Sequence, residues 1–152
     1  TNSSIFASLP DATKIYFGSG GDVNGSGVNY ICYAWKNVTG YSRAGFYTGN
    51  GAVDGTFVYT GFKPAFVFLK EVSNADNWII MDNKRLGYNP RNEHLFPNLT
   101  SVEYATDRIN LHSNGFKINN DDGGINTSGA TYIYISFGQS LVGSNNVPCT
   151  AR

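Results

Sequence analysis

One thirteen-residue pattern occurs twice in this chain and places the strongest constraint on its fold. Residues 23–35 read VNGSGVNYICYAW and residues 125–137 read INTSGATYIYISF, with identical residues at five of the thirteen positions. A short polar turn followed by a run rich in Tyr and Ile predicts a turn and then a β-strand. Recurrence 102 residues later predicts two copies of one module.

The repeat divides the chain into four expected parts. Residues 1–36 are predicted to be the closing strands of a preceding, incomplete copy, and residues 37–45 a linker. Residues 46–137 are predicted to be one complete β module, and residues 138–152 an irregular tail. Because the chain begins with Thr1 rather than Met, we interpret it as a processed or excised piece of a modular structural protein.

The charge balance of the chain excludes several classes of partner. Charged residues make up 14% of the 152 residues, and the net charge is zero. Nucleic-acid binding and polybasic membrane attachment both need a basic surface, so we expect neither. No apolar run approaches the ~20 residues of a membrane-spanning helix, so membrane insertion is not expected. Sparse charge beside many Asn, Ser, Thr and Tyr residues is typical of an extracellular or virion-surface protein.

The composition and patterning predict an all-β fold. The chain has 10 Tyr, 10 Phe and 18 Gly, and no long window shows a helical period of 3.6 residues. Several short strands separated by turns predict an antiparallel β-sandwich or a jelly-roll-like module. Strands are expected at 65–71, 78–81 and 131–137. The prominent core residues are expected to be Phe66, Phe68, Ile80, Tyr132 and Tyr134.

Two cysteines leave two interpretations open. Cys32 lies in an apolar run and Cys149 lies near the C-terminus, so they either form one disulfide or remain a buried thiol and a tail thiol. The second interpretation is favoured, because nothing in the pattern pairs the two residues.

No catalytic or metal motif emerges from the ionisable residues. Asp121 and Asp122, with Asn119 and Asn120, form the densest group of oxygen ligands, but the spacing of a calcium-binding EF-hand loop is absent, which favours a Gly-rich turn. The two histidines, His94 and His112, have no nucleophile paired with them by motif. We therefore expect no catalytic residue, no metal and no cofactor. A pair of carboxylates for glycoside cleavage remains an open alternative.

The long irregular segment 82–100 is the best candidate for ligand contacts. Loops of this length are usually functional or lie in interfaces. An aromatic ring can stack on a sugar, and Asn, Arg and Asp supply fixed donors and acceptors. The predicted contacts in this loop are Tyr88, Asn89, Arg91, Asn92 and His94. A weaker second patch is predicted at Asn120, Asp121 and Asp122. The alternative is that the loop lies in a subunit interface.

Six blocks of the sequence together resemble a repeat module of tailed-phage structural proteins, common in phages of marine cyanobacteria. The blocks are YTGNG at 47–51, GFKPAFVFLK at 61–70, NWIIMDNKR at 77–85, SNGFKI at 113–118, NTSGATYIYISF at 126–137 and VGSNNVPCTAR at 142–152. The resemblance implies a tail-fibre or host-recognition protein on the virion surface, with other virion proteins as partners. It assigns no catalytic site, and it does not extend to the individual segment 86–104.

These observations give three functional hypotheses. The leading one is a non-catalytic fibre or spike module on the virion that attaches to a host-surface glycan. The second is a purely structural or capsid-decoration module, and the third is a glycan depolymerase. Uncovered apolar surface and strand edges predict a homo-oligomer. The number three for its subunits comes only from the resemblance to fibres.

Overall fold

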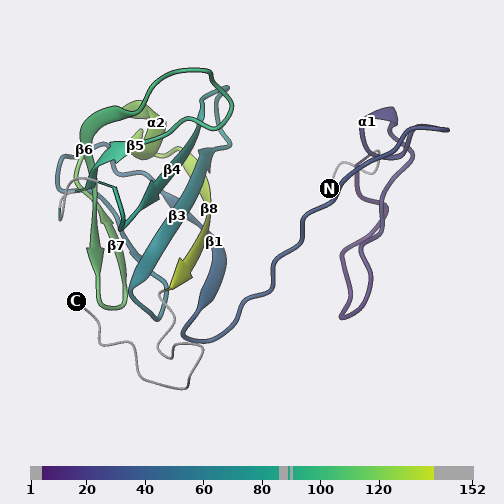
Figure 1. Ribbon diagram of the computed structural model, residues 1–152, viewed down its shortest axis with the longest axis horizontal. Coiled ribbons are helices and arrows are strands. Elements are labelled where there is room, and N and C mark those ends of the chain that lie inside the picture. The colour runs from purple at the N-terminus through teal and green to yellow at the C-terminus, as the bar shows by residue number, and fades with distance from the viewer. Residues whose placement is uncertain (1–4, 86–88, 90, 139–152) are drawn as a thin grey trace. The chain divides into compact units, whose positions relative to one another are not determined.

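The computed structural model describes residues 5–85, 89 and 91–138, and it divides the chain into two compact units. The first unit is Thr1–Ala34 and the second is Trp35–Arg152. All eight strands found in the described residues belong to the second unit, and the described part of the first has one short helix, α1, Gly21–Asn24 (Figure 1). Neither described helix has the length or the apolar run needed to span a membrane.

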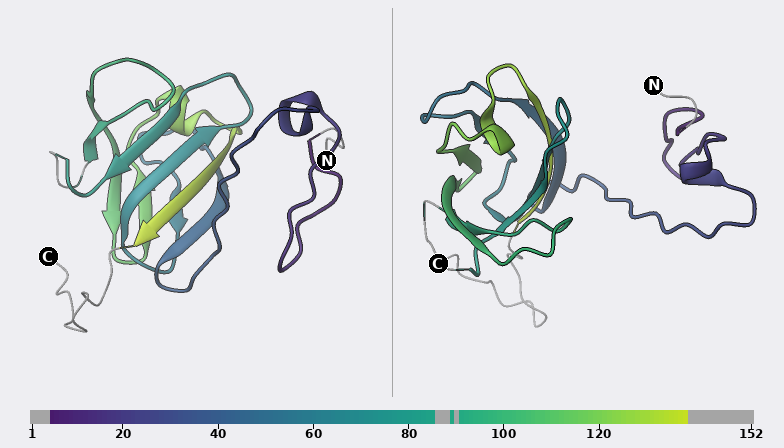
Figure 2. Two further views of the ribbon diagram at one scale, coloured as in Figure 1. Left: turned by 45° about the vertical axis from the view of Figure 1, so that its right-hand side comes forward. Right: turned by 90° about the horizontal axis from the view of Figure 1, so that it is seen from above.

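The second unit is an antiparallel β-sandwich, which confirms the predicted fold class. One sheet has the order β1-β8-β3-β4 and the other the order β2-β7-β6-β5. Figure 2 shows the sheets as two curved layers that face each other. The first sheet contains β1 (Ser42–Thr48), β8 (Thr131–Gly138), β3 (Pro64–Glu71) and β4 (Trp78–Asp82). The second contains β2 (Phe57–Tyr59), β7 (Gly115–Ile118), β6 (Tyr104–His112) and β5 (Arg91–His94).

The three strands expected at 65–71, 78–81 and 131–137 all form and lie side by side in the first sheet. Of the five expected core residues, Tyr132 and Tyr134 are buried in the core, whereas Phe66, Phe68 and Ile80 lie on the outer face of the first sheet. Val67 and Leu69 are fully buried, whereas Phe66 and Phe68 are only half-buried on the opposite face of β3. Because side chains alternate along a strand, a run that is apolar on both faces does not show which face is inside.

The core consists of aliphatic residues around a small group of rings. Tyr47 stacks on Tyr132, with 4.9 Å between ring centroids and 12° between their planes. Phe116 packs edge-on against Tyr47 and Tyr134, at 6.3 Å and 5.5 Å. Phe116 and Tyr132 have no exposed surface, so these rings join the two sheets at the centre of the sandwich.

Two boundaries differ from the sequence expectation. The predicted linker 37–45 overlaps β1, which begins at Ser42, and the residues before it form a turn. The predicted irregular segment 82–100 contains β5, which pairs with β6 with a register shift between Arg91 and Glu93. The polar sequence of β5, Arg-Asn-Glu-His, lacks the apolar alternation by which strands are recognised.

The helix α2 (Gly123–Asn126) contacts the loop that follows β1. We call this contact, between residues 49–52 and 123–130, the Asn126 junction. Asn126 is fully buried, and its Nδ2 donates to Asn50 Oδ1 at 2.9 Å, the Ala52 carbonyl at 2.7 Å and the Asn120 carbonyl at 3.0 Å. Its Oδ1 accepts from the Asn50 N–H at 3.0 Å. A Cβ on Gly49 would come within 2.3 Å of the Thr127 carbonyl oxygen, so the approach requires glycine.

The first unit has no strand longer than a single bridge among its described residues. Backbone hydrogen bonds join residues 5–7 to 16–18 as a hairpin, and Phe6 stacks on Phe17 at 6.3 Å. The helix α1 follows, and residues 28–36 then run without an assigned strand. The closing strands expected in residues 1–36 are therefore reduced, among the described residues of this unit, to the bridge between Phe6 and Phe17, because no strand pairs with residues 28–34.

Candidate functional site

The predicted ligand loop is only partly described, and two of its side chains have structural roles. Tyr88 and the side chains of Arg91 and Asn92 lie outside the described part of the structure. The Oδ1 of Asn89 accepts from the Leu111 N–H at 2.7 Å, and its Nδ2 donates to the Leu111 carbonyl at 2.9 Å. His94 is only 1% exposed. It packs against Phe96 and Tyr104, with ring centroids 5.0 Å and 5.8 Å away. His94 therefore has almost no surface to offer to a ligand.

The weaker patch is used largely to hold α2 in place. Asp122 caps the helix by accepting from the Gly124 N–H at 2.8 Å, and it pairs with Arg108 Nη1 at 2.9 Å. Burial alone would raise the pKa of Asp122, but the Arg108 guanidinium and the Gly124 N–H lower it below its usual value. Asn120 donates to the Asp107 carbonyl at 2.8 Å. Asp121 is exposed. The patch is thus a capped turn, as the Gly-rich interpretation predicted.

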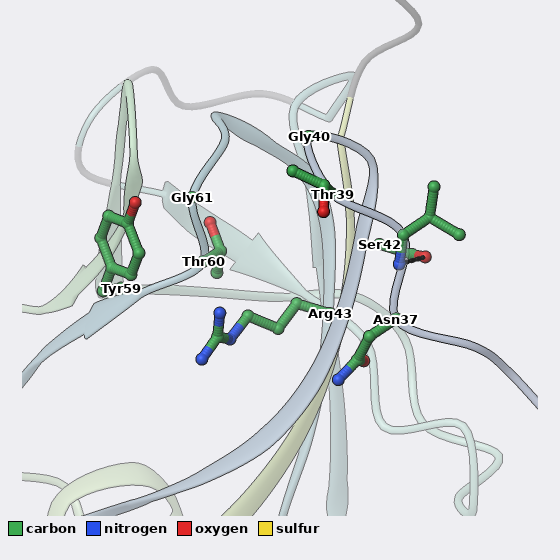
Figure 3. Close-up of a pocket in the computed structure, with 9 residues that line it drawn as sticks. Asn37, Thr39, Gly40, Ser42, Arg43, Tyr59, Thr60 and Gly61 are labelled. Atoms are coloured by element: carbon green, nitrogen blue, oxygen red, sulfur yellow. Dashed lines mark hydrogen bonds between the residues drawn. The ribbon is translucent and has the colours of Figure 1, made fainter.

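A polar pocket lies elsewhere, between the turn that leads into β1 and the connection that follows β2 (Figure 3). Its volume is about 210 Å³. This is below the usual range for drug-sized ligands, so the pocket suits a single small polar group such as one sugar ring. Its lining residues are Asn37, Val38, Thr39, Gly40, Ser42, Arg43, Tyr59, Thr60 and Gly61.

The wall formed by residues 37–42 is a closed turn. The N–H of Val38 donates to the Ser42 carbonyl and the N–H of Ser42 to the Val38 carbonyl, each at 2.9 Å. Gly40 supplies the left-handed backbone that the turn needs, with a φ of 77°. Asn37 Oδ1 accepts from the Ala44 N–H at 2.7 Å and so attaches the turn to β1.

The facing wall is equally well supported. The N–H groups of Thr60 and Gly61 both donate to the Asn114 carbonyl, at 2.9 Å and 3.1 Å. Thr60 Oγ1 donates to the Phe62 carbonyl at 2.6 Å. Gly61 has a φ of 84°, a conformation that favours glycine. Because backbone hydrogen bonds hold both walls, the pocket is formed before any ligand binds.

The functional groups of the pocket are a guanidinium, an aromatic ring and an amide. Arg43 extends from β1 toward Tyr59 and Thr60 (Figure 3). Its guanidinium carbon lies 6.0 Å from the centroid of the Tyr59 ring, within cation–π range. Tyr59 is 57% exposed. Among the described residues, Arg43 forms no ion pair with a carboxylate, so its charge is available to a ligand anion.

The sequence analysis missed this pocket for a physical reason. Residues 37–45 have the composition of a linker, and Tyr59 belongs to a three-residue strand with no distinctive pattern. The pocket forms only because β1 and β2, from different sheets, bring Arg43 and Tyr59 together. The Gly residues at 40 and 61 marked turns, but nothing in the sequence indicated that the two turns are neighbours.

The comparisons with known proteins give one match. The model of a family described as a domain of unknown function (DUF7483) matches residues 1–140, which are the first compact unit and the second up to residue 140. Comparison with curated proteins gave no match, and neither did comparison with solved structures.

Proposed function

The chain belongs to the DUF7483 family, and on that premise we propose that it is a non-catalytic module of a phage fibre or spike that binds an acidic glycan of the host surface. The observation that carries the proposal is the pairing of Arg43 with the exposed Tyr59 in a preformed pocket. The resemblance of the sequence blocks to phage structural modules supports the location on the virion, with other virion proteins as neighbours.

The chemistry of the pocket favours an acidic sugar. A sugar ring has an apolar face that can stack on an aromatic ring such as Tyr59. The guanidinium of Arg43 can form a bidentate pair of hydrogen bonds with a carboxylate, and each ring of a polyuronic acid carries one carboxylate. Asn37 and Thr39 line the same pocket and supply donors and acceptors for sugar hydroxyls.

The proposal predicts binding of an acidic oligosaccharide that depends on Arg43. In isothermal titration calorimetry with a tetrasaccharide of galacturonic acid, we expect saturable binding. Arg43→Ala should weaken the affinity about tenfold or more, because a charge-assisted hydrogen bond contributes roughly 1.5–3 kcal/mol. Tyr59→Ala should weaken the affinity by a smaller factor, and the neutral tetrasaccharide of glucose should bind more weakly than the acidic one.

Two control variants and one product assay complete this test. Lys84→Ala removes an exposed positive charge away from the pocket, and Phe46→Ala removes an exposed ring from the opposite face of β1. Both should bind like the unmodified chain. If Lys84→Ala weakened the affinity as much as Arg43→Ala, the binding would be a nonspecific attraction between opposite charges. Release of shorter fragments from the tetrasaccharide would support the depolymerase alternative.

A second candidate function, assembly alone, is favoured by the outer face of the first sheet. Side chains of β3, β4 and β8 form an apolar hollow there, beside Trp35, with a volume of about 230 Å³. Phe46 and Ile133, which are paired across β1 and β8, are also exposed on this face. Exposed apolar surface of this kind marks an interaction site. The other lining residues are Phe66, Phe68, Ile80, Ile135 and Phe137.

The outer face predicts self-association, which we propose to be trimeric by analogy with fibres. Sedimentation velocity at micromolar concentration should show an oligomer. Phe46→Asp should shift the chain toward the monomer, because it places a charge in the apolar contact. A chain that sediments as a monomer before any substitution would exclude this role.

A further inference from the structure

The first unit contains the same local structure as one half of the Asn126 junction, and none of its described residues forms the other half. The helices α1 (Gly21–Asn24) and α2 (Gly123–Asn126) are separated by 102 positions, the period of the sequence repeat. Each is followed by a glycine with left-handed backbone, Gly27 with a φ of 73° and Gly129 with a φ of 78°. The two turns therefore have the same backbone pattern.

Three side-chain hydrogen bonds of the two turns also correspond. Asn24 Nδ2 donates to the carbonyl six residues earlier at 3.1 Å, and Asn126 Nδ2 does the same at 3.0 Å. The hydroxyl of Tyr30 accepts from the N–H five residues earlier and donates to the carbonyl nine residues earlier. The hydroxyl of Tyr132 forms the same two bonds. The hairpin of residues 5–18 precedes α1 as β6 and β7 precede α2.

The two copies differ in what surrounds them. Three further hydrogen bonds join the Asn126 side chain to Asn50 and Ala52, and Tyr132 stacks on Tyr47. The strand β8 lies between β1 and β3. The segment equivalent to β8, residues 29–36, has no assigned strand, and Ile31 is 81% exposed. Cys32 is also exposed, although the sequence predicted a buried thiol, and its counterpart Tyr134 is buried in the core.

We propose that residues 18–36 close a second copy of the sandwich, with α1 and the following segment in the places of α2 and β8. The partner is the part of another copy of the module that corresponds to β1–β5. The Tyr-Thr-Gly-Asn-Gly loop of that partner forms hydrogen bonds with the Asn24 side chain, as residues 49–52 do with Asn126. The segment 29–36 then becomes the strand between the equivalents of β1 and β3, and Cys32 enters the core. This inference does not depend on the glycan site.

The repeat period provides a direct experiment on the full chain. Residues 37–102 are placed directly before residue 1, so that every spacing of the complete module is kept, and Cys149→Ser leaves Cys32 as the single thiol. We expect alkylation of Cys32 by a maleimide to be at least about tenfold slower in this extended chain than in the unextended one, because burial in a folded module limits access. Hydrogen exchange of amides 29–36 should slow in parallel.

Asn24→Ala provides the matched control. In the unextended chain this substitution should leave the alkylation rate of Cys32 unchanged, because Cys32 is already exposed. In the extended chain it should restore fast alkylation, since it removes the residue that enters the added loop. If Cys32 reacts equally fast in both chains, the proposal is overturned. Protection that persists with Asn24→Ala would also overturn it, because nonspecific collapse would then explain the result.

Discussion

Asn126→Ala should destabilise the sandwich by about 3–5 kcal/mol, because three groups that the fully buried Asn126 side chain contacts in part-buried hydrogen bonds would each lose a partner, at a cost of roughly 1–3 kcal/mol. These groups are the Asn50 N–H and the carbonyls of Ala52 and Asn120. The effect would be a large fraction of the total stability of an ordinary domain, about 5–15 kcal/mol. This change in the free energy of unfolding can be measured by urea unfolding, followed by the fluorescence of Trp78. Trp78 stacks on Phe68 in the first sheet.

The repeat supplies the control for this prediction. Asn24 has the equivalent position in the first unit, where its side chain donates a hydrogen bond to the Gly18 carbonyl at 3.1 Å. Asn24→Ala should therefore change the free energy of unfolding of the sandwich by less than about 0.5 kcal/mol, the range for substitutions away from the core. Equal effects at the two positions would show that the Asn126 junction does not hold the sandwich together.

Phe116→Ala should lower the free energy of unfolding by a similar amount, about 3–5 kcal/mol, because apolar burial is lost and a cavity remains. Its ring has no exposed surface and contacts two other rings, Tyr47 and Tyr134. Phe68→Ala is the matched substitution on the outer face of β3. There the ring is half-buried and stacks on Trp78 at 4.7 Å, so the cost should be about 1–2 kcal/mol.

The two phenylalanine variants can be compared in one thermal or urea unfolding series. The orientation of β3 requires Phe116→Ala to be the more damaging of the two. If Phe68→Ala proved the more damaging, Phe68 would lie in the core as the sequence pattern predicted, and Val67 and Leu69 would face outward.

The fold class was predictable because strong local signals agreed. Three apolar runs indicated strands that occur, at β3, β4 and β8, whereas the strand indicated after the first copy of the repeated turn does not form. The face of each strand was not predictable, because β3 carries apolar side chains on both sides. Its charged residues gave no guidance either, since Glu71 is buried while Lys70 lies on the opposite face. Only the position of the second sheet decides which face becomes the core.

The candidate site was less predictable than the fold. Asn89, His94 and Asp122 are of residue types suited to binding, but the structure uses them for backbone hydrogen bonds, packing and a helix cap. Arg43 and Tyr59 are 16 positions apart and lie in different sheets, so no local pattern joins them. Their juxtaposition depends on how the two sheets are connected, and a single sequence does not contain that information in a readable form.

The most direct measurement of the central claim is a nuclear magnetic resonance titration of the ¹⁵N-labelled chain with the tetrasaccharide of galacturonic acid. The proposed pocket predicts that the amide signals of residues 37–43 and 59–61 shift progressively and saturate together, while those of residues 89–94 and 120–122 remain unchanged. If the shifts instead gathered at 89–94 or 120–122, or if no signal moved at millimolar tetrasaccharide, the assignment of glycan binding to Arg43 and Tyr59 would be contradicted.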